Sequence, residues 1–304
     1  MRAIDRSWMF VLPKDSKGWI LDAICHEIGQ RVRGPVRYEY NPPAKQPLPA
    51  ADVYFFAHYW TFLDRVTRHP EVVNSKVLIW YTHPREIPYT REQELHAYGR
   101  ATQLICTNGR FLADWLSAGL PKDRTSVVLG GADPHIFKGH KRGDGLVGLS
   151  SSYYPRKGAE RIHELIRRMP GRRFRLLGRH WEDYPGFDAL RSLPNFEYVQ
   201  AEYKDYPGHY REFDVFLSMA TMEGGPIPLL EAMMSNAVPV ASRTGFAQDL
   251  ICDRVNGYTF DVDQPVADVI ALVDTAFDLK QDIRETVLPY SWENFAYNVI
   301  SLAD

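Results

Sequence analysis

The sequence predicts an α/β protein built on parallel sheets. Short apolar runs of strand length alternate with stretches of helical periodicity along nearly the whole chain, and this alternation is typical of parallel strands joined by helices. At 304 residues the chain is long enough for one large or two ordinary domains. Residues 133–145 mix Gly and Pro with charged residues, which is a linker composition. We therefore expect two domains with a boundary in this segment.

Each expected element follows from a local pattern. In the first half, apolar runs predict strands at 8–12, 53–56, 77–81, 104–107 and 126–129, with helices at 20–30, 91–98 and 110–118. In the second half, strands are expected at 146–149, 174–177, 196–199, 215–218, 238–241 and 257–260. The helices between them are expected at 159–169, 206–213, 227–234 and 266–279.

Composition favours an ordinary soluble protein. Hydrophobic residues make up 45% and charged residues 24%, and the net charge of −2 gives no nucleic-acid footprint. The three cysteines (Cys25, Cys106 and Cys252) are widely spaced, so we expect reduced thiols, a cytosolic compartment and no structural zinc. No apolar run of 18 residues occurs. Residues 1–140 hold 18 Lys/Arg against 14 Asp/Glu, an excess that suits an acidic or membrane-surface acceptor but that chance explains equally well.

The most informative segment runs from Glu223 to Glu231. A buried strand at 215–218 leads into Glu223-Gly224-Gly225, and a helix is expected to follow at 227–234. A glycine loop that feeds a helix N-terminus is suited to anions, because free N–H groups and the helix dipole point the same way. Glu231 would lie about 12 Å along the helix from Glu223 at 1.5 Å per residue, a length that suits a sugar–diphosphate–ribose. The spacing alone is equally compatible with a helix that happens to carry Glu at both ends.

The whole segment resembles the E-x7-E motif of retaining nucleotide-sugar glycosyltransferases of the GT4 group. Residues 127–137 resemble the family's entry into its second domain, and Ser291-Trp292-Glu293 resembles its terminal S-W-E helix. The resemblance covers most of 127–300 and, more loosely, 1–126. It implies the GT-B fold, in which two Rossmann-like domains face a central cleft. The expected domains are 1–138 for the acceptor, joined by a returning helix at 290–304, and 143–287 for the donor.

The resemblance gives Lys157 the role of meeting the donor diphosphate. A lysine there offsets the charge of the leaving group without a metal. Relatives usually carry an arginine six residues earlier, where this chain has Ser151. Either Arg156 substitutes for it or the diphosphate is held less tightly.

The resemblance also gives roles to the Glu223–Glu231 segment. Glu231 would accept hydrogen bonds from the ribose hydroxyls, as the acidic residue of a dinucleotide site does. Glu223 would contact the donor sugar and stabilise its developing positive charge. Backbone N–H groups facing the donor are expected from Gly224, Gly225 and Ile227. Many relatives have glycine in place of Pro226, and proline has no N–H to give.

Two candidates come from the first half. His83 follows the expected strand at 77–81, and the resemblance places a histidine there facing the donor sugar across the cleft. Gly18 lies in the loop before the first helix and suits close backbone approach to phosphate or acceptor. His58 also follows a strand, but a structural role is favoured for it.

From this resemblance we expect a metal-independent, hexosyltransferase-like enzyme that retains anomeric configuration. Asp183, Asp205 and Asp214 form no D-x-D metal motif, and no cofactor is expected beyond a UDP-, GDP- or similar nucleotide-sugar donor. The acceptor is a glycan, a lipid-linked or a small molecule, with a cytoplasmic location and peripheral contact at the inner membrane face through the first domain. Two alternatives stay open. One is an isomerase similar to UDP-N-acetylglucosamine 2-epimerase. The other is a non-catalytic partner subunit of the same fold, which is compatible with the departures from the family pattern at Ser151 and Pro226.

Overall fold

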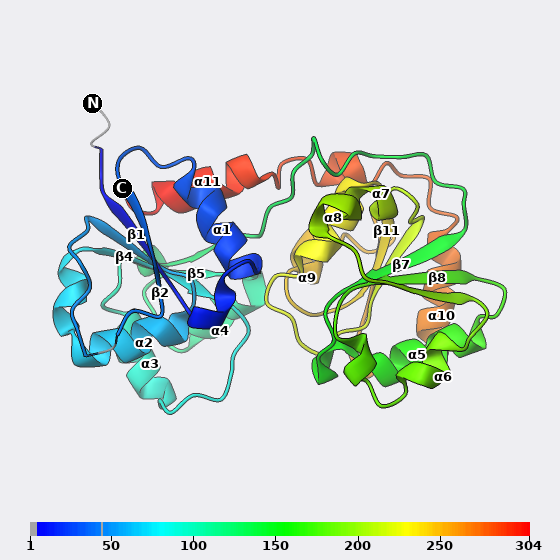
Figure 1. Ribbon diagram of the computed structural model, residues 1–304, viewed down its shortest axis with the longest axis horizontal. Coiled ribbons are helices and arrows are strands. Elements are labelled where there is room, and N and C mark those ends of the chain that lie inside the picture. The colour runs from blue at the N-terminus through cyan, green and yellow to red at the C-terminus, as the bar shows by residue number, and fades with distance from the viewer. Residues whose placement is uncertain (1–4, 44) are drawn as a thin grey trace. The chain divides into compact units, whose positions relative to one another are not determined.

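The computed structural model describes residues 5–43 and 45–304. The chain divides into two compact units (Figure 1). One unit comprises the chain up to Leu129 together with Trp292–Asp304, and the other comprises Gly130–Ser291. Within the described residues, each unit is built on its own six-stranded sheet, and every strand pair in both sheets is parallel. The predicted α/β class with parallel sheets is confirmed.

The first unit has the strand order β2-β1-β3-β4-β5-β6. Its central strands are buried on both faces, as parallel strands covered by helices require. The strands are β1 (Trp8–Leu12), β2 (Val36–Tyr40), β3 (Val53–Phe56), β4 (Lys76–Tyr81), β5 (Gln103–Cys106) and β6 (Thr125–Val127). The helices are α1 (Ile20–Gly29), α2 (Tyr59–Arg68), α3 (Arg91–Tyr98) and α4 (Gly109–Ser117).

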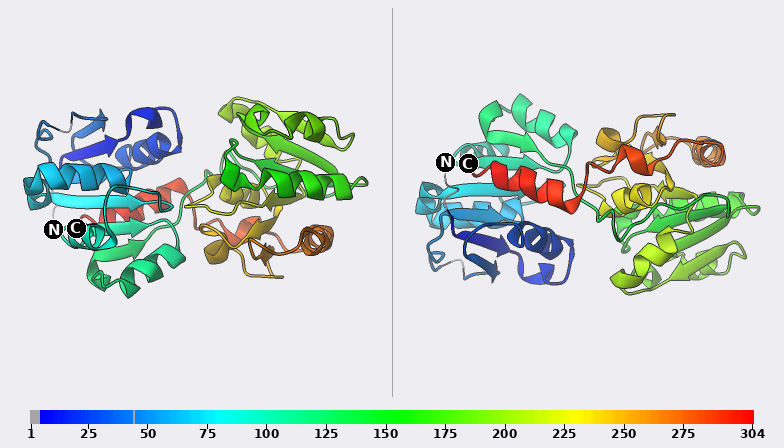
Figure 2. Two further views of the ribbon diagram at one scale, coloured as in Figure 1. Left: turned by 90° about the horizontal axis from the view of Figure 1, so that it is seen from below. Right: turned by 90° about the horizontal axis from the view of Figure 1, so that it is seen from above.

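The C-terminal helix α11 (Trp292–Ser301) belongs to the first unit. It packs beside α1, as both views of Figure 2 and the contacts of the two helices show. The Phe295 ring meets Trp80 of β4 edge-on, with 5.5 Å between centroids. Arg6 donates from Nη1 to the carbonyl of Ala303 at 2.5 Å. The expected return of the last helix to the first domain is therefore confirmed.

The second unit has the strand order β12-β11-β10-β7-β8-β9. Successive strands run outward from β7 on one side and from β10 on the other, so the winding direction reverses between β7 and β10, as in a dinucleotide-binding sheet. The strands are β7 (Leu146–Ser150), β8 (Arg173–Leu177), β9 (Phe196–Val199), β10 (Val215–Ser218), β11 (Val238–Ser242) and β12 (Tyr258–Phe260). The helices are α5 (Ala159–Arg168), α6 (Phe187–Arg191), α7 (Tyr206–Tyr210), α8 (Ile227–Met234), α9 (Ala247–Leu250) and α10 (Val266–Ala276).

The linker-like segment 133–145 is bound to the second unit along its length. His140 Nδ1 lies 2.6 Å from the carbonyl oxygen of Ser235. Arg142 donates to the carbonyls of Leu279 and Gln281 at 2.9 and 2.7 Å. These contacts satisfy the carbonyl of the residue that caps α8 and two carbonyls of the loop after α10. The division between the units falls at residues 129 and 130, ahead of the segment.

Two elements of the first unit were not predicted. The edge strand β2 has no fully buried residue and lacks a continuous apolar run, so its sequence gives no signal of a buried strand. The start of α2 is capped by His58, whose Nδ1 accepts the Trp60 N–H at 3.2 Å, and histidine is not a usual cap residue. No helix in the described part of the chain is long and apolar enough to cross a membrane.

Candidate active site

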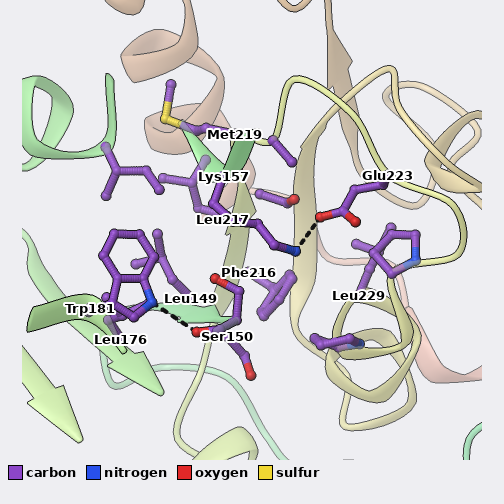
Figure 3. Close-up of a pocket in the computed structure, with 16 residues that line it drawn as sticks. Leu149, Ser150, Lys157, Leu176, Trp181, Phe216, Leu217, Met219, Glu223 and Leu229 are labelled. Carbon is purple, nitrogen blue, oxygen red and sulfur yellow. Dashed lines mark hydrogen bonds and ion pairs between the residues drawn. The ribbon is translucent and has the colours of Figure 1, made fainter. Parts of the chain in front are cut away.

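A pocket opens at the carboxyl ends of β7 and β10 in the second unit (Figure 3). Ser150 and Ser151 line it from the end of β7, and Ser218 and Met219 line it from the end of β10. These strands flank the point where the strand order reverses, which is where open α/β sheets bind nucleotides. The indole of Trp181, which is fully buried, also lines the pocket.

The charged group of the pocket is an ion pair between Lys157 and Glu223. Lys157 Nζ lies 2.5 Å from Glu223 Oε1, and the two side chains point toward each other in Figure 3. Arg156 Nη1 lies 3.0 Å from the other oxygen, Oε2, and 3.0 Å from the carbonyl of Met222. One nearly buried carboxylate therefore receives two cations, one on each oxygen.

The local chain explains why Lys157 faces the β10 loop. Pro155–Lys157 forms one turn of 3₁₀ helix, which ends at Gly158 with a φ of 73°. A Cβ at Gly158 would lie 2.4 Å from the carbonyl oxygen of Met219, so only glycine allows this approach. The Arg156 carbonyl accepts the Thr221 N–H at 2.8 Å, which ties the turn to the loop that carries Glu223.

Gly245, which the sequence did not indicate as a site residue, packs closely against the loop that carries Glu223. It has a φ of 53°, and a Cβ there would lie 2.8 Å from the Gly224 carbonyl oxygen and 2.9 Å from Glu223 Cβ. The available signal was a lone glycine just after the β11 run, a position that often marks a close backbone approach.

The glycine loop passes into α8 as predicted. Pro226 is the N-cap residue and Pro228 occupies the second helical position, so two residues at this helix start have no N–H. Leu229 N–H donates to the Pro226 carbonyl at 2.9 Å. Ile227 is buried, with its side chain close to Gly130.

Glu231 lies in a second cluster, apart from the lining of the pocket. It is buried on α8, and Tyr203 donates its hydroxyl to Oε1 at 2.5 Å. Burial raises the pKa of Glu231 to about 7, and the hydrogen bond from Tyr203 works against that rise. The sequence reasoning missed Tyr203 and Tyr210, although Tyr203, Tyr206 and Tyr210 recur at the three-to-four spacing of one helical face.

Ser151 takes part chiefly through its backbone. Its carbonyl accepts the Trp181 Nε1–H at 2.8 Å, and Ser151 N–H donates to the Leu177 carbonyl at 2.9 Å. The strand end is therefore fixed, and a short side chain lines the pocket where an arginine was expected from the resemblance.

The first-unit candidates lie at the carboxyl ends of its strands. His83 follows β4 and is partly buried, and Gly18, at a φ of 77°, donates its N–H to Asp22 Oδ2 at 2.8 Å. Burial, then Arg85 and His83, lower the pKa of His58 to about 3, so its ring is neutral and acts as the cap of α2. The structure thus gathers Lys157, Glu223 and their neighbours in the second unit, while His83 and Gly18 belong to the first.

Comparisons with known proteins give one family model and several solved structures of the same fold. Residues 137–286 match the family model described as glycosyl transferases group 1. HepE (Alr3699) from Anabaena, solved with UDP, superposes with a TM-score of 0.76 at 14% identity, covering 96% of this chain and 98% of that one. Sucrose-phosphate synthase from Thermosynechococcus elongatus gives 0.76 at 14% identity, covering 98% of each chain. The lipopolysaccharide outer core galactosyltransferase WaaB gives 0.73 at 12% identity, covering 97% and 98%.

No curated protein matches by sequence. The matched range spans nearly all of the second unit, which is therefore similar to the group 1 glycosyltransferases. The GT-B class expected from the sequence is confirmed by the strand orders of the two units and by the solved structures.

Proposed function

We propose that this glycosyltransferase moves a sugar from a nucleotide diphosphate donor to an acceptor hydroxyl, with retention of configuration and without a divalent metal. The observation that carries the proposal is the Lys157–Glu223 pair at the carboxyl edge between β7 and β10. A cation and a carboxylate side by side suit a donor whose phosphate is anionic and whose sugar becomes cationic as the bond breaks.

In the proposed reaction the bond from the anomeric carbon to the diphosphate oxygen breaks, and that oxygen keeps the electron pair. Lys157 and Arg156 stabilise the charge that gathers on the diphosphate. The acceptor hydroxyl attacks from the same face, and the departing phosphate takes its proton, so configuration is retained. Glu223 faces the sugar and stabilises its oxocarbenium-like centre.

Arg156 supports this reaction despite the serine at position 151. Its guanidinium already lies beside Glu223, 3.0 Å from Oε2. It therefore supplies a second cation beside Glu223, next to Lys157. A second cation compensates for the missing arginine, because charge stabilisation depends on position and not on the strand of origin.

The rest of the donor is assigned to α8 and its loop. Glu231 accepts hydrogen bonds from the ribose hydroxyls, and Gly224, Gly225 and Ile227 direct backbone N–H groups at sugar or phosphate oxygens. HepE has been solved with UDP-glucose as well as with UDP, so uridine donors are the first to test.

The acceptor is assigned to the first unit. His83 and Gly18 lie beyond the carboxyl ends of β4 and β1, where loops of a parallel sheet bind ligands. A glycan, a lipid-linked or a small-molecule acceptor is proposed, with peripheral membrane contact through this unit in the lipid-linked case.

The test begins with a panel of UDP- and GDP-sugars scored by thermal shift, because a ligand that binds only the folded state raises the midpoint. The donor that binds is then incubated with an acceptor library, and the anomeric configuration of the product is read by NMR. Transfer with retention supports the proposal. Conversion of donor alone to an epimer would identify an isomerase, and donor binding with neither transfer nor hydrolysis would identify a non-catalytic subunit.

A further inference from the structure

We propose that Tyr203 is a positioning residue of the donor site, whose hydroxyl holds Glu231 ionised and oriented for the ribose diol. The inference rests on the proposed function, because it assigns a partner to the carboxylate proposed to bind ribose. Its basis is a hydrogen bond that joins two segments 28 residues apart and reaches a carboxylate that is only 2% exposed.

Glu231 lies where an isolated carboxylate is costly. It is the second of the two carboxylates on the E-x7-E segment, and the side chains packed around it on α8 are apolar. A buried carboxylate without a cation must be hydrogen-bonded or protonated. Burial raises the pKa of Glu231 to about 7.

The polar groups that act on the Glu231 carboxylate among the described residues include the hydroxyls of Tyr203 and Tyr210. Tyr203 donates to Oε1 at 2.5 Å from the 3₁₀ turn Tyr203–Asp205. The hydroxyl of Tyr210, which is fully buried on α7, faces Glu231 as well and, like Tyr203, works against the rise of its pKa. Tyr206 of the same helix lies further along that face. From the segment 284–286, packed against α8, Arg284 directs its guanidinium to the carbonyls of Met234 and Pro134 instead.

Tyr203 is placed to act on a ligand as well as on Glu231. More than half of its surface is exposed (53%), while its ring packs 5.6 Å from Tyr206 and 6.2 Å from Phe137. Its hydroxyl bonds Oε1 of Glu231. Only the ionised carboxylate accepts hydrogen bonds at both oxygens without itself donating one. A hydroxyl that favours the ionised form therefore favours ribose binding at neutral pH.

The experiment measures the affinity for UDP and for GDP between pH 6 and pH 9 by calorimetry, in the unmutated chain, Tyr203→Phe and Tyr206→Phe. Loss of the hydrogen bond raises the pKa of Glu231, and a rise of about one unit leaves about a tenth of it ionised at pH 7. Tyr203→Phe should therefore bind about fivefold more weakly at pH 7 and recover near pH 9, its profile displaced by about one pH unit. Tyr206→Phe removes a hydroxyl from the same aromatic cluster, leaves the Tyr203–Glu231 hydrogen bond in place and should match the unmutated profile.

Three outcomes overturn the inference, and they are distinguishable. If Tyr203→Phe binds the nucleotide as tightly as the unmutated chain at every pH, Tyr203 does not position Glu231. If it binds more tightly, Tyr203 competes with the ribose. If the unmutated chain binds neither UDP nor GDP, the proposed donor site itself fails and this inference fails with it.

Discussion

Lys157 and Glu223 stand 66 residues apart in the chain, yet their charged atoms lie 2.5 Å apart at the mouth of one pocket. The pair joins the turn after β7 to the loop after β10, the two strands between which the winding direction reverses. In this state the carboxylate also engages Arg156 at 3.0 Å. Donor phosphate would compete with Glu223 for both cations, so binding and catalysis should respond differently to changes at this pair.

Replacement of Glu223 by Gln should affect nucleotide binding and catalysis in different ways. Lys157 and Arg156 lose their anionic partner, so the affinity for a nucleoside diphosphate should increase. The cationic sugar loses its stabilising carboxylate, so kcat should fall about 10²-fold, the usual loss for one electrostatic stabiliser. Calorimetry with UDP or GDP and steady-state kinetics give the two numbers. Glu285→Gln, at an exposed site of the same unit, is the matched control, and a kcat close to that of the unmutated enzyme would remove Glu223 from the site.

Lys157→Ala should act on the transition state more than on the ground state. The charge on the diphosphate grows as the glycosidic bond breaks, so kcat should fall about 10²-fold while KM for the donor changes less. Steady-state kinetics on folded protein, checked by circular dichroism, gives the comparison, with Lys280→Ala as an exposed control. If Lys157→Ala keeps its kcat and Arg156→Ala loses it, the role belongs to Arg156.

Transfer should persist in excess EDTA. The proposed neutralisation of the leaving group comes from Lys157 and Arg156, which already converge on Glu223. The measurement is product formation before and after chelation, followed by addition of Mg²⁺ or Mn²⁺. Complete loss that a metal restores would assign the neutralisation to a bound ion.

Glu231→Ala should weaken nucleotide binding by about 1.5–3 kcal/mol, the range for a hydrogen bond to a charged group. The reason is loss of the acceptor for the ribose hydroxyls. Calorimetry at pH 8, where the unmutated carboxylate is ionised, is the measurement, and Glu285→Ala is the control. Unchanged affinity in a folded variant would place the ribose elsewhere.

Glu231 should also make stability depend on pH. Its folded-state pKa, raised to about 7 from 4.5, means that the folded protein binds a proton that the unfolded chain releases. The stabilisation is complete below about pH 4.5 and is lost as pH rises through 7, a loss of about 3 kcal/mol. Urea unfolding of the unmutated chain and of Glu231→Gln at pH 5 and pH 8 checks this. Relative to the unmutated chain, Glu231→Gln should have a higher free energy of unfolding at pH 8 than at pH 5. A difference that is the same at both pH values would contradict the prediction.

Local patterns in the sequence were sufficient to predict most elements. The strands at 196–199 and 215–218 and the helices at 91–98 and 227–234 begin and end where the structure has them. Hydrophobic periodicity, turn residues and short apolar runs depend only on residues that are close together in the sequence, so they can be recognised without the structure. The half-buried edge strand β2 was missed because an edge strand has a weaker apolar signal than a buried one.

The sequence by itself determined the α/β class, the Glu223–Glu231 spacing on one loop and helix, and the place of Lys157 before Gly158. Only the tertiary structure decided which of these groups meet. It paired Lys157 and Arg156 with Glu223, brought Tyr203 onto Glu231, and set Gly245 beneath the glycine loop. The reason is that strand order and register are long-range. They place β7 beside β10, although the two strands lie more than sixty residues apart in the chain. Local hydrophobic periodicity carries no information about which strands pair.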